Sequence, residues 1–147
     1  MIVPDVIQVL LQEHNEMRRL STDVRQAGGT DKKCLFAELY QLVNVHELGD
    51  LAVVHPAARG KTANGDRTVL ACMTDGGDIA RALAGLHALG VEDVTFDSKF
   101  AIVHQAIHDH TAHEERDEFP LLRRYVSIQR LHMMAGELHD VEAMGVN

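Results

Sequence analysis

Apolar residues recur at helical spacing in four long stretches of the chain, and no stretch alternates apolar and polar residues convincingly as a strand would. The long stretches cover about residues 4–27, 31–60, 66–89 and 93–125, and a shorter one follows at about 127–143. Glycines, which commonly end helices, stand at or just after the ends of the first three. Long helices joined by short loops predict an all-α protein, an antiparallel up-down-up-down four-helix bundle with a short extra C-terminal helix.

The fourth stretch carries polar residues inside its apolar stripe. Since an α-helix turns by about 100° per residue, side chains within about 60° of Val103 share one face. These are Phe96, Phe100, Ile107, His110, Glu114 and Leu121. We therefore expect His110 and Glu114 to point into the core. The remaining polar residues are predicted to lie on the flanks or the surface, namely His104, His108, His113 and Glu115.

The second stretch has the same organisation around His46. Its inward face is predicted to hold Leu35, Leu39, Leu42, Val43, Asp50, Val53 and Ala57. His55 falls on the opposite side of the helix, where we expect it to face solvent or a neighbouring chain. The pair His46 and Asp50 thus repeats the inward spacing of His110 and Glu114.

An internal repeat strengthens this correspondence. The segments "HELGDLAVVHPAAR" (46–59) and "HTAHEERDEFPLLR" (110–123) each begin with His and carry a carboxylate four residues later. Both also have Pro at the tenth residue after the first His and Arg at the thirteenth. The chain therefore reads as two helical hairpins in tandem, each containing an inward His-x-x-x-acid pair.

Three histidines and two acids are predicted to meet in one layer of the bundle. His14 lies near the middle of the first helix, as His46 and His110 do in theirs, and mid-helix positions meet in an antiparallel bundle. Burying such groups unpaired costs several kcal/mol. Imidazole and carboxylate are ligands of transition metals such as iron, manganese and zinc. A metal site is the favoured interpretation, and His–carboxylate pairs that satisfy one another without metal are the alternative.

Composition narrows the class of partner. The 147 residues carry a net charge of −8, which argues against nucleic acid and anionic membranes. No apolar run approaches the length of a membrane span. Cys34 and Cys72 are isolated from each other and fit a reducing compartment, so a cytoplasmic protein is expected. The Met-rich segment "LHMMAGEL" and apolar flank residues leave a homodimer open.

With these motifs the chain resembles the hemerythrin-like family, the HHE cation-binding domains. The resemblance covers about residues 5–125 within a single domain at 1–147, and "HEERDEFPLLR" is especially similar to the fourth-helix text of that family. It implies a non-haem di-iron centre bridged by carboxylates in a four-helix bundle. The metal ligands would be His14, His46, Asp50, His110 and Glu114.

Two departures from the family pattern touch the site. Asp50 stands in place of the second-helix Glu, and Gly76 stands where the third helix should carry its His. Glu47, about 100° around the helix from His46, is a further ligand candidate. The site is therefore expected to bind two irons with an extra open position, to bind one metal, or to have lost its metal.

The resemblance implies several activities for a metal-loaded bundle. They are reversible O2 binding, sensing of O2, NO or iron, and decomposition of peroxide. One rival is a metal-free bundle that acts as an interaction module, and another is a peroxide-consuming enzyme. Metal analysis separates the metal-free bundle from the others, and oxygen evolution from peroxide identifies the enzyme.

Overall fold

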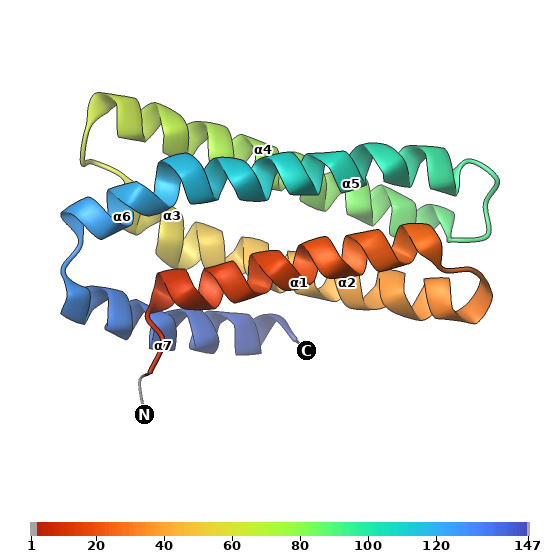
Figure 1. Cartoon of the computed structure of the whole chain (residues 1–147), viewed down its shortest axis with the longest axis horizontal. Coiled ribbons are helices and arrows are strands. Elements are labelled where there is room, and N and C mark those ends of the chain that lie inside the picture. Colours follow the sequence, from red (N-terminus) through yellow and green to blue (C-terminus); the bar gives the residue numbers. More distant parts are fainter. Residues whose placement is uncertain (1–2, 147) are drawn as a thin grey trace.

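The computed structural model describes residues 3–146, which fold into two long helical hairpins and a C-terminal helix (Figure 1). The α-helices are α1 (Val6–Gln26), α2 (Gly29–Gly49), α3 (His55–Ala58), α4 (Ala63–Leu89), α5 (Phe96–His113), α6 (Phe119–Tyr125) and α7 (Ile128–Gly145). A π-helical turn joins α2 to α3 at Asp50–Val54, and a second joins α5 to α6 at Glu114–Glu118. The predicted all-α antiparallel four-helix bundle with an extra C-terminal helix is confirmed, and residues 3–146 contain no strand.

Local signals at the helix ends explain the boundaries. Asp5 forms a capping box with Gln8 at the start of α1. The Thr62 side chain accepts a hydrogen bond from the backbone of Gly65, so α4 begins three residues before the expected Asp66. Gly90 ends α4 with a positive φ of 90°, a conformation that glycine adopts without strain.

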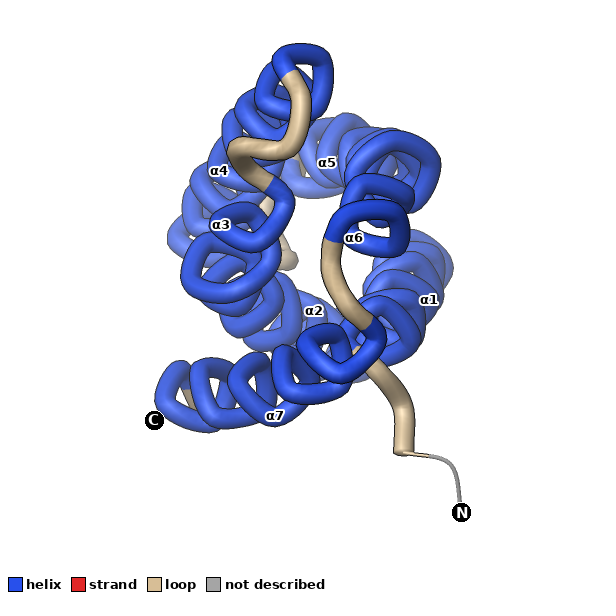
Figure 2. Tube along the Cα trace, turned by 90° about the vertical axis from the view of Figure 1, so that its left-hand side faces the viewer, coloured by secondary structure: helices blue, strands red, loops and turns tan. Residues whose placement is uncertain are grey.

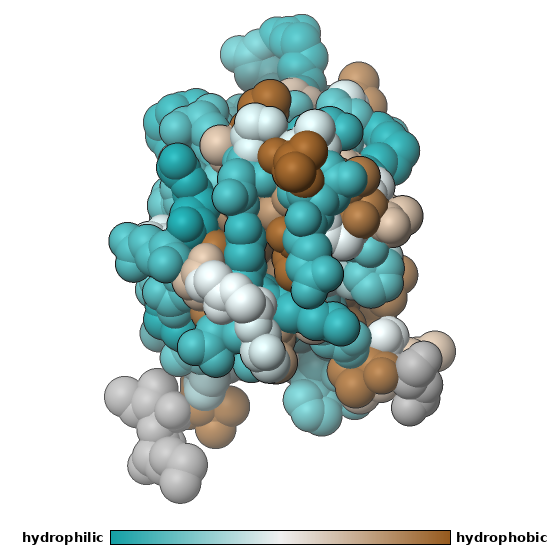
Figure 3. All heavy atoms as spheres, turned by 90° about the vertical axis from the view of Figure 1, so that its right-hand side faces the viewer, coloured by the Kyte–Doolittle hydropathy of each residue, from teal (hydrophilic) through white to brown (hydrophobic). Residues whose placement is uncertain are grey.

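Two apolar clusters fill the bundle and leave a polar layer between them. The cluster at the end with the α1–α2 and α4–α5 loops includes the aromatic rings of Phe36, Phe96 and Phe100. The cluster at the other end includes Leu10 and Leu122. Figure 3 looks onto the loop end, where hydrophilic residues cover most of the surface and hydrophobic ones form small separate spots. The apolar side chains are thus gathered inside, above and below the polar layer.

The π turns shift everything that follows them by one residue position. A π turn contains one residue more than an α turn, so the face that points inward moves along the sequence. Ala57 and Leu121 were predicted to point inward, but their neighbours Ala58 and Leu122 are the fully buried ones. Both wrong predictions lie just past a π turn. The error is therefore the assumption of an ordinary α turn at these places, and the helices themselves were predicted correctly.

The C-terminal helix α7 lies outside the four-helix bundle and packs across α1 and α2 (Figure 2). It buries Leu131, Met134 and Leu138 against them. Gly49 in α2 makes this approach possible, because a Cβ atom there would overlap the Leu138 side chain. None of the described helices is both long and apolar enough to cross a membrane.

Candidate metal centre

Glu114 is the centre of a buried polar cluster in the middle of the bundle. The nearest contact of its Oε1 atom is His110 Nε2 at 2.9 Å, one helical turn earlier on α5. His14 Nε2 of α1 lies 3.4 Å from the same oxygen, and His46 Nε2 of α2 lies 3.9 Å from it. All four side chains are at most 4% exposed. The structure therefore brings together the three histidines that the sequence places in the layer.

Asp50 lies on the other side of this cluster and connects it to His55. Its Oδ2 atom is 3.3 Å from His46 Nε2 and 4.0 Å from His55 Nε2. The expectation that His55 faces solvent is wrong, because its side chain is 1% exposed. The π turn at Asp50–Val54 supplies the physical reason, since the extra residue turns His55 from the outside of the helix towards the core.

Two triads in the cluster have ligand atoms close enough to share a metal ion. His14, His46 and Glu114 form one, and Asp50, His55 and Glu114 form the other. Within each triad the potential ligand atoms lie within 4.8 Å of one another. Glu114 belongs to both triads, so its carboxylate lies close enough to contribute a ligand atom to either group.

Three of the histidine rings are held from behind by carboxylates. His14 Nδ1 lies 2.7 Å from Glu115 Oε2, and His46 Nδ1 lies 2.7 Å from Glu13 Oε1. His55 Nδ1 lies 2.5 Å from Glu118 Oε1. A carboxylate at Nδ1 leaves Nε2 as the free ligand atom and fixes the direction in which it points.

The free nitrogens point into the cluster without hydrogen-bond partners among the described residues. The Nε2 atoms of His14, His46 and His55 are buried and unpartnered, as are both oxygens of Asp50 and of Glu114. Orphaned polar atoms of this kind cost free energy unless something satisfies them. Nitrogen and oxygen donors of this kind fit a transition-metal site.

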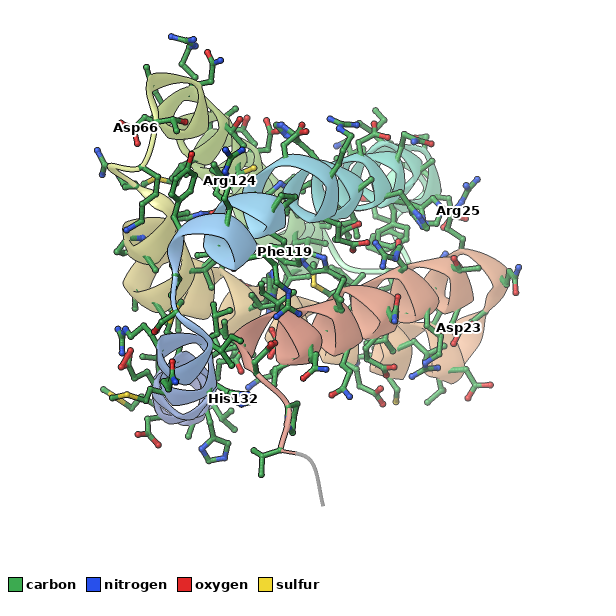
Figure 4. The ribbon with its side chains drawn as sticks, turned by 60° about the vertical axis from the view of Figure 1, so that its left-hand side comes forward. Asp23, Arg25, Asp66, Phe119, Arg124 and His132 are labelled. Atoms are coloured by element: carbon green, nitrogen blue, oxygen red, sulfur yellow. The ribbon has the colours of Figure 1, made fainter. Side chains whose placement is uncertain are left out.

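His14 is further fixed by an aromatic neighbour. The ring of Phe119 stacks on the ring of His14 with centroids 5.4 Å apart. Figure 4 shows Phe119 reaching from α6 into the space beside α1. Arg18 adds a hydrogen bond of 2.8 Å to Glu115, the carboxylate behind His14. The His14 side of the cluster is thus held in place by an ion pair, a hydrogen bond and a stacked ring.

Burial and neighbouring charges act in opposite directions on the pKa values of the buried groups in the cluster. Burial alone would raise the pKa of Glu114, but His110, His14 and His46 hold it well below its usual range. Burial and the neighbouring Glu114 raise the pKa of Asp50. Burial opposes protonation of His46, yet Asp50 and Glu114 raise its pKa well above the ordinary value. Metal binding would therefore release a proton from His46, as it does wherever a ligand must be deprotonated.

Glu47, the further ligand candidate, occupies the space that Gly76 leaves on α4. A Cβ atom at Gly76 would overlap the Glu47 carboxylate. Burial, and after it the charge of Asp50, raises the pKa of this carboxyl group. Glu47 is absent from both Glu114 triads, so it lies beside the cluster, and its role as a ligand stays a prediction.

The other histidines of α5 lie away from the cluster, on the flanks where their phase puts them. His104 Nδ1 is 2.6 Å from the Ser21 hydroxyl, and its ring meets that of His108 edge to face. His113 lies 3.8 Å from the Cys72 thiol and 3.3 Å from Asp117. None of the three belongs to the Glu114 triads.

Sequence reasoning missed His55 and Glu118, and it passed over Glu13 and Glu115. The first two lie at the end of a π turn or just beyond one, where simple helical phase fails. The repeat gave no sign of the π turns, because both copies keep the same His-to-Pro and His-to-Arg spacing. An extra residue at the same offset in both copies preserves that match while changing the face on which the later residues lie.

Comparison with known proteins supports the fold. No protein-family model and no curated protein matches the sequence. Among solved structures, a hemerythrin HHE cation-binding domain-containing protein from Mycobacterium kansasii superposes with a TM-score of 0.84. The match covers 98% of this chain and 88% of that one, at 14% sequence identity. With its polar layer in the bundle core, the chain therefore has the fold of a hemerythrin HHE cation-binding domain protein.

Proposed function

We propose that the protein binds a pair of iron ions in the polar layer and uses them to bind a small ligand such as O2 or peroxide. His14, His46 and Glu114 would hold the first ion, and Asp50, His55 and Glu114 the second. His110 would complete the layer from α5 beside Glu114. The similar Mycobacterium kansasii protein is described as containing a cation-binding domain, which agrees with a metal at this place in the fold.

One observation carries the proposal, the orientation of the three carboxylate-backed imidazoles. Each has its Nδ1 atom engaged by a carboxylate outside the cluster and its Nε2 atom buried and unpartnered inside it. This carboxylate–histidine arrangement is typical of metal ligands, because it fixes the tautomer and raises the basicity of the ligating nitrogen. In a bundle stabilised only by internal ion pairs, these Nε2 atoms would face the carboxylates of Asp50 and Glu114 at 3.3 to 4.0 Å without a hydrogen bond to either.

The chain contributes positioning and exclusion of water to the chemistry. Bound iron would supply a Lewis acid with an open coordination position, which O2 binding and peroxide reactions need. The open position is expected where α4 supplies no ligand at Gly76, next to the Glu47 carboxylate that occupies the space there. The apolar clusters above and below the layer keep bulk water from the ligands.

A metal-free bundle is the second candidate, and one contact favours it. His110 Nε2 lies 2.9 Å from Glu114 Oε1, close enough for the pair to satisfy each other by charge alone. In that case the layer would be a structural ion-pair network, and the protein would act through its surface.

Anaerobic titration with ferrous iron, followed by metal analysis, tests the proposal. We expect two ions per chain and a higher melting temperature, because a ligand that binds only the folded state stabilises it. A His46→Ala variant should lose metal, whereas His139→Ala, whose ring is 83% exposed, should keep it. Protein that stays metal-free and is not stabilised by iron would support the second candidate. Oxygen evolution from hydrogen peroxide would identify a peroxide-decomposing activity.

A further inference from the structure

A groove of about 710 Å³ runs between α4 and α5 on the outside of the bundle. Ile79 and Ala82 line it from α4, and Val103 and Ala106 line it from α5. Three acids stand around it, Asp75, Asp78 and Asp109, against one arginine, Arg116. The groove therefore offers an apolar surface within a net negative rim, which suits small uncharged molecules and repels anions.

The groove reaches the polar layer at one residue. Of the six clustered side chains described above, His110 alone lines it. His110 is also the layer histidine with no carboxylate behind its ring, and both of its ring nitrogens lack a hydrogen-bond partner among the described residues. At 4% exposure the ring is more than nine-tenths buried and still in contact with the groove.

The other faces of the layer are closed by side chains. Glu13, Glu115 and Glu118 cover the outer nitrogens of the three other histidines. A second groove, between α1 and α6, ends on Phe119, whose ring covers His14. α4 itself supplies no ligand to the layer, because residue 76 is glycine and the Glu47 carboxylate of α2 occupies the space beside it.

We propose that the α4–α5 groove is the path by which a small uncharged ligand reaches the metal pair. This inference rests on the proposed function and adds the route and the charge of the ligand. Dioxygen, nitric oxide and hydrogen peroxide are small uncharged molecules of this kind. Anions would be repelled by the acidic residues around the groove before they reach His110.

The first test uses the metal-free protein, so that its result does not depend on whether the protein binds metal. Dissolved O2 is paramagnetic and speeds the relaxation of protons that it approaches. Under O2 pressure, NMR should show stronger relaxation at the Val103 and Ala106 methyl groups and at the His110 ring than at the His14 ring. Equal relaxation at His14 and His110 would overturn the route.

The second test blocks the groove in the ferrous protein. Ala106→Phe should slow the association of nitric oxide by about tenfold or more, because the new ring fills the passage. If Ala106→Phe lowers the melting temperature, Ala82→Phe replaces it as the blocking variant. Ala82 lies at an exposed position on the α4 wall of the groove. Ala84→Phe on α4 is the matched control outside the groove, and Leu11→Phe is the control in the α1–α6 groove.

The outcomes separate the route from the proposed function. Unchanged association rates in both blocked variants at full metal content would overturn the route and leave metal binding intact. Slower association in Leu11→Phe alone would also overturn it, by assigning the passage to the α1–α6 side. A wild-type chain that binds no metal would contradict the proposed function, while the O2 relaxation pattern would still decide whether the groove admits the ligand.

Discussion

His55 Nδ1 lies 2.5 Å from Glu118 Oε1, although 63 residues separate them in sequence. Both side chains are buried, and each belongs to a different hairpin of the bundle. His55 immediately follows the first π turn and Glu118 closes the second. The pair therefore exists only because both turns are widened, and it brings a histidine to the side of the layer where α4 supplies none.

Replacing His55 should remove one metal ion and spare the other. His55 belongs only to the triad with Asp50, so His55→Ala should weaken the second ion by more than about 100-fold, beyond the effect of losing an outer partner. The first ion keeps His14 and His46. If each triad holds one ion, metal analysis after dialysis should give about two ions per chain for wild type and about one for His55→Ala. Retention of both ions would remove His55 from the ligand set.

Glu118 is expected to act through His55. In Glu118→Gln the amide keeps the shape of the side chain but loses the charge that orients the imidazole. Affinity for the second ion should fall by about 10–100-fold, the usual cost of changing an outer partner. The circular dichroism spectrum should not change. An effect as large as that of His55→Ala would indicate that Glu118 ligates the metal directly.

Because the Glu47 carboxylate fills the space beside Gly76, the effect of a Gly76 substitution on stability should depend on whether Glu47 is present. Gly76→Ala adds helix propensity of about 0.5–1 kcal/mol, but the new methyl group must displace the end of the Glu47 side chain. The gain should be fully present in a Glu47→Ala background and reduced in wild type. Denaturant unfolding of the four metal-free proteins measures this difference. Equal gains in both backgrounds would show that Glu47 leaves the site freely.

The C-terminal helix should make stability depend on pH. Burial and the neighbouring Glu13 raise the pKa of Glu142 from 4.5 to about 8. Between these values the folded chain binds a proton that the unfolded chain has lost, so stability falls as pH rises through this window. Metal-free Glu142→Gln should show a smaller fall than wild type, because the raised pKa values of Glu47, Asp50 and His46 still contribute. Asp140→Asn, at an 85% exposed position, is the control and should follow wild type in melts across the same range.

The two cysteines should differ sharply in reactivity. Cys34 is exposed, whereas Cys72 is buried next to acidic groups. Burial, followed by the charges of Glu118 and Glu114, raises the pKa of the Cys72 thiol far above its ordinary value. Because the thiolate is the nucleophile, a thiol-specific reagent should modify Cys34 rapidly and Cys72 only after unfolding. Rapid modification of both thiols in the native protein would contradict this arrangement.

Helical phase predicted the bundle and the centre of its polar layer. His46, His110 and Glu114 could be placed because each lies before the π turn of its helix or at its first residue, and His14 because α1 has no π turn. Asp50 could be placed for the same reason, since the first π turn only begins there. The apolar stripes on both sides fixed the depth of these residues within the bundle.

Positions beyond the π turns could not be predicted from a constant rotation per residue. Nothing in the composition of Asp50–Val54 or Glu114–Glu118 marks these segments as wider than an α turn. The choice depends on tertiary contacts such as His55 with Glu118, which form only when the two hairpins meet. The position of Glu47 is likewise a tertiary result, since it depends on a glycine 29 positions away on another helix.

Because of the two π turns, the number of residues in each long helix decides which side chains reach the polar layer. Each π turn contains one residue more than an α turn. In a continuous α-helix this extra residue would rotate His55 or Glu118 out of the layer. Deleting one residue from 51–54 would let an ordinary α turn hold His55 where it now lies. Adding one there would instead turn His55 by about 100° unless the helix widened again. In genetic terms the two turns behave as single-codon insertions that the fold has absorbed, and one more codon inserted there would move His55 out of the layer while leaving the hairpins intact.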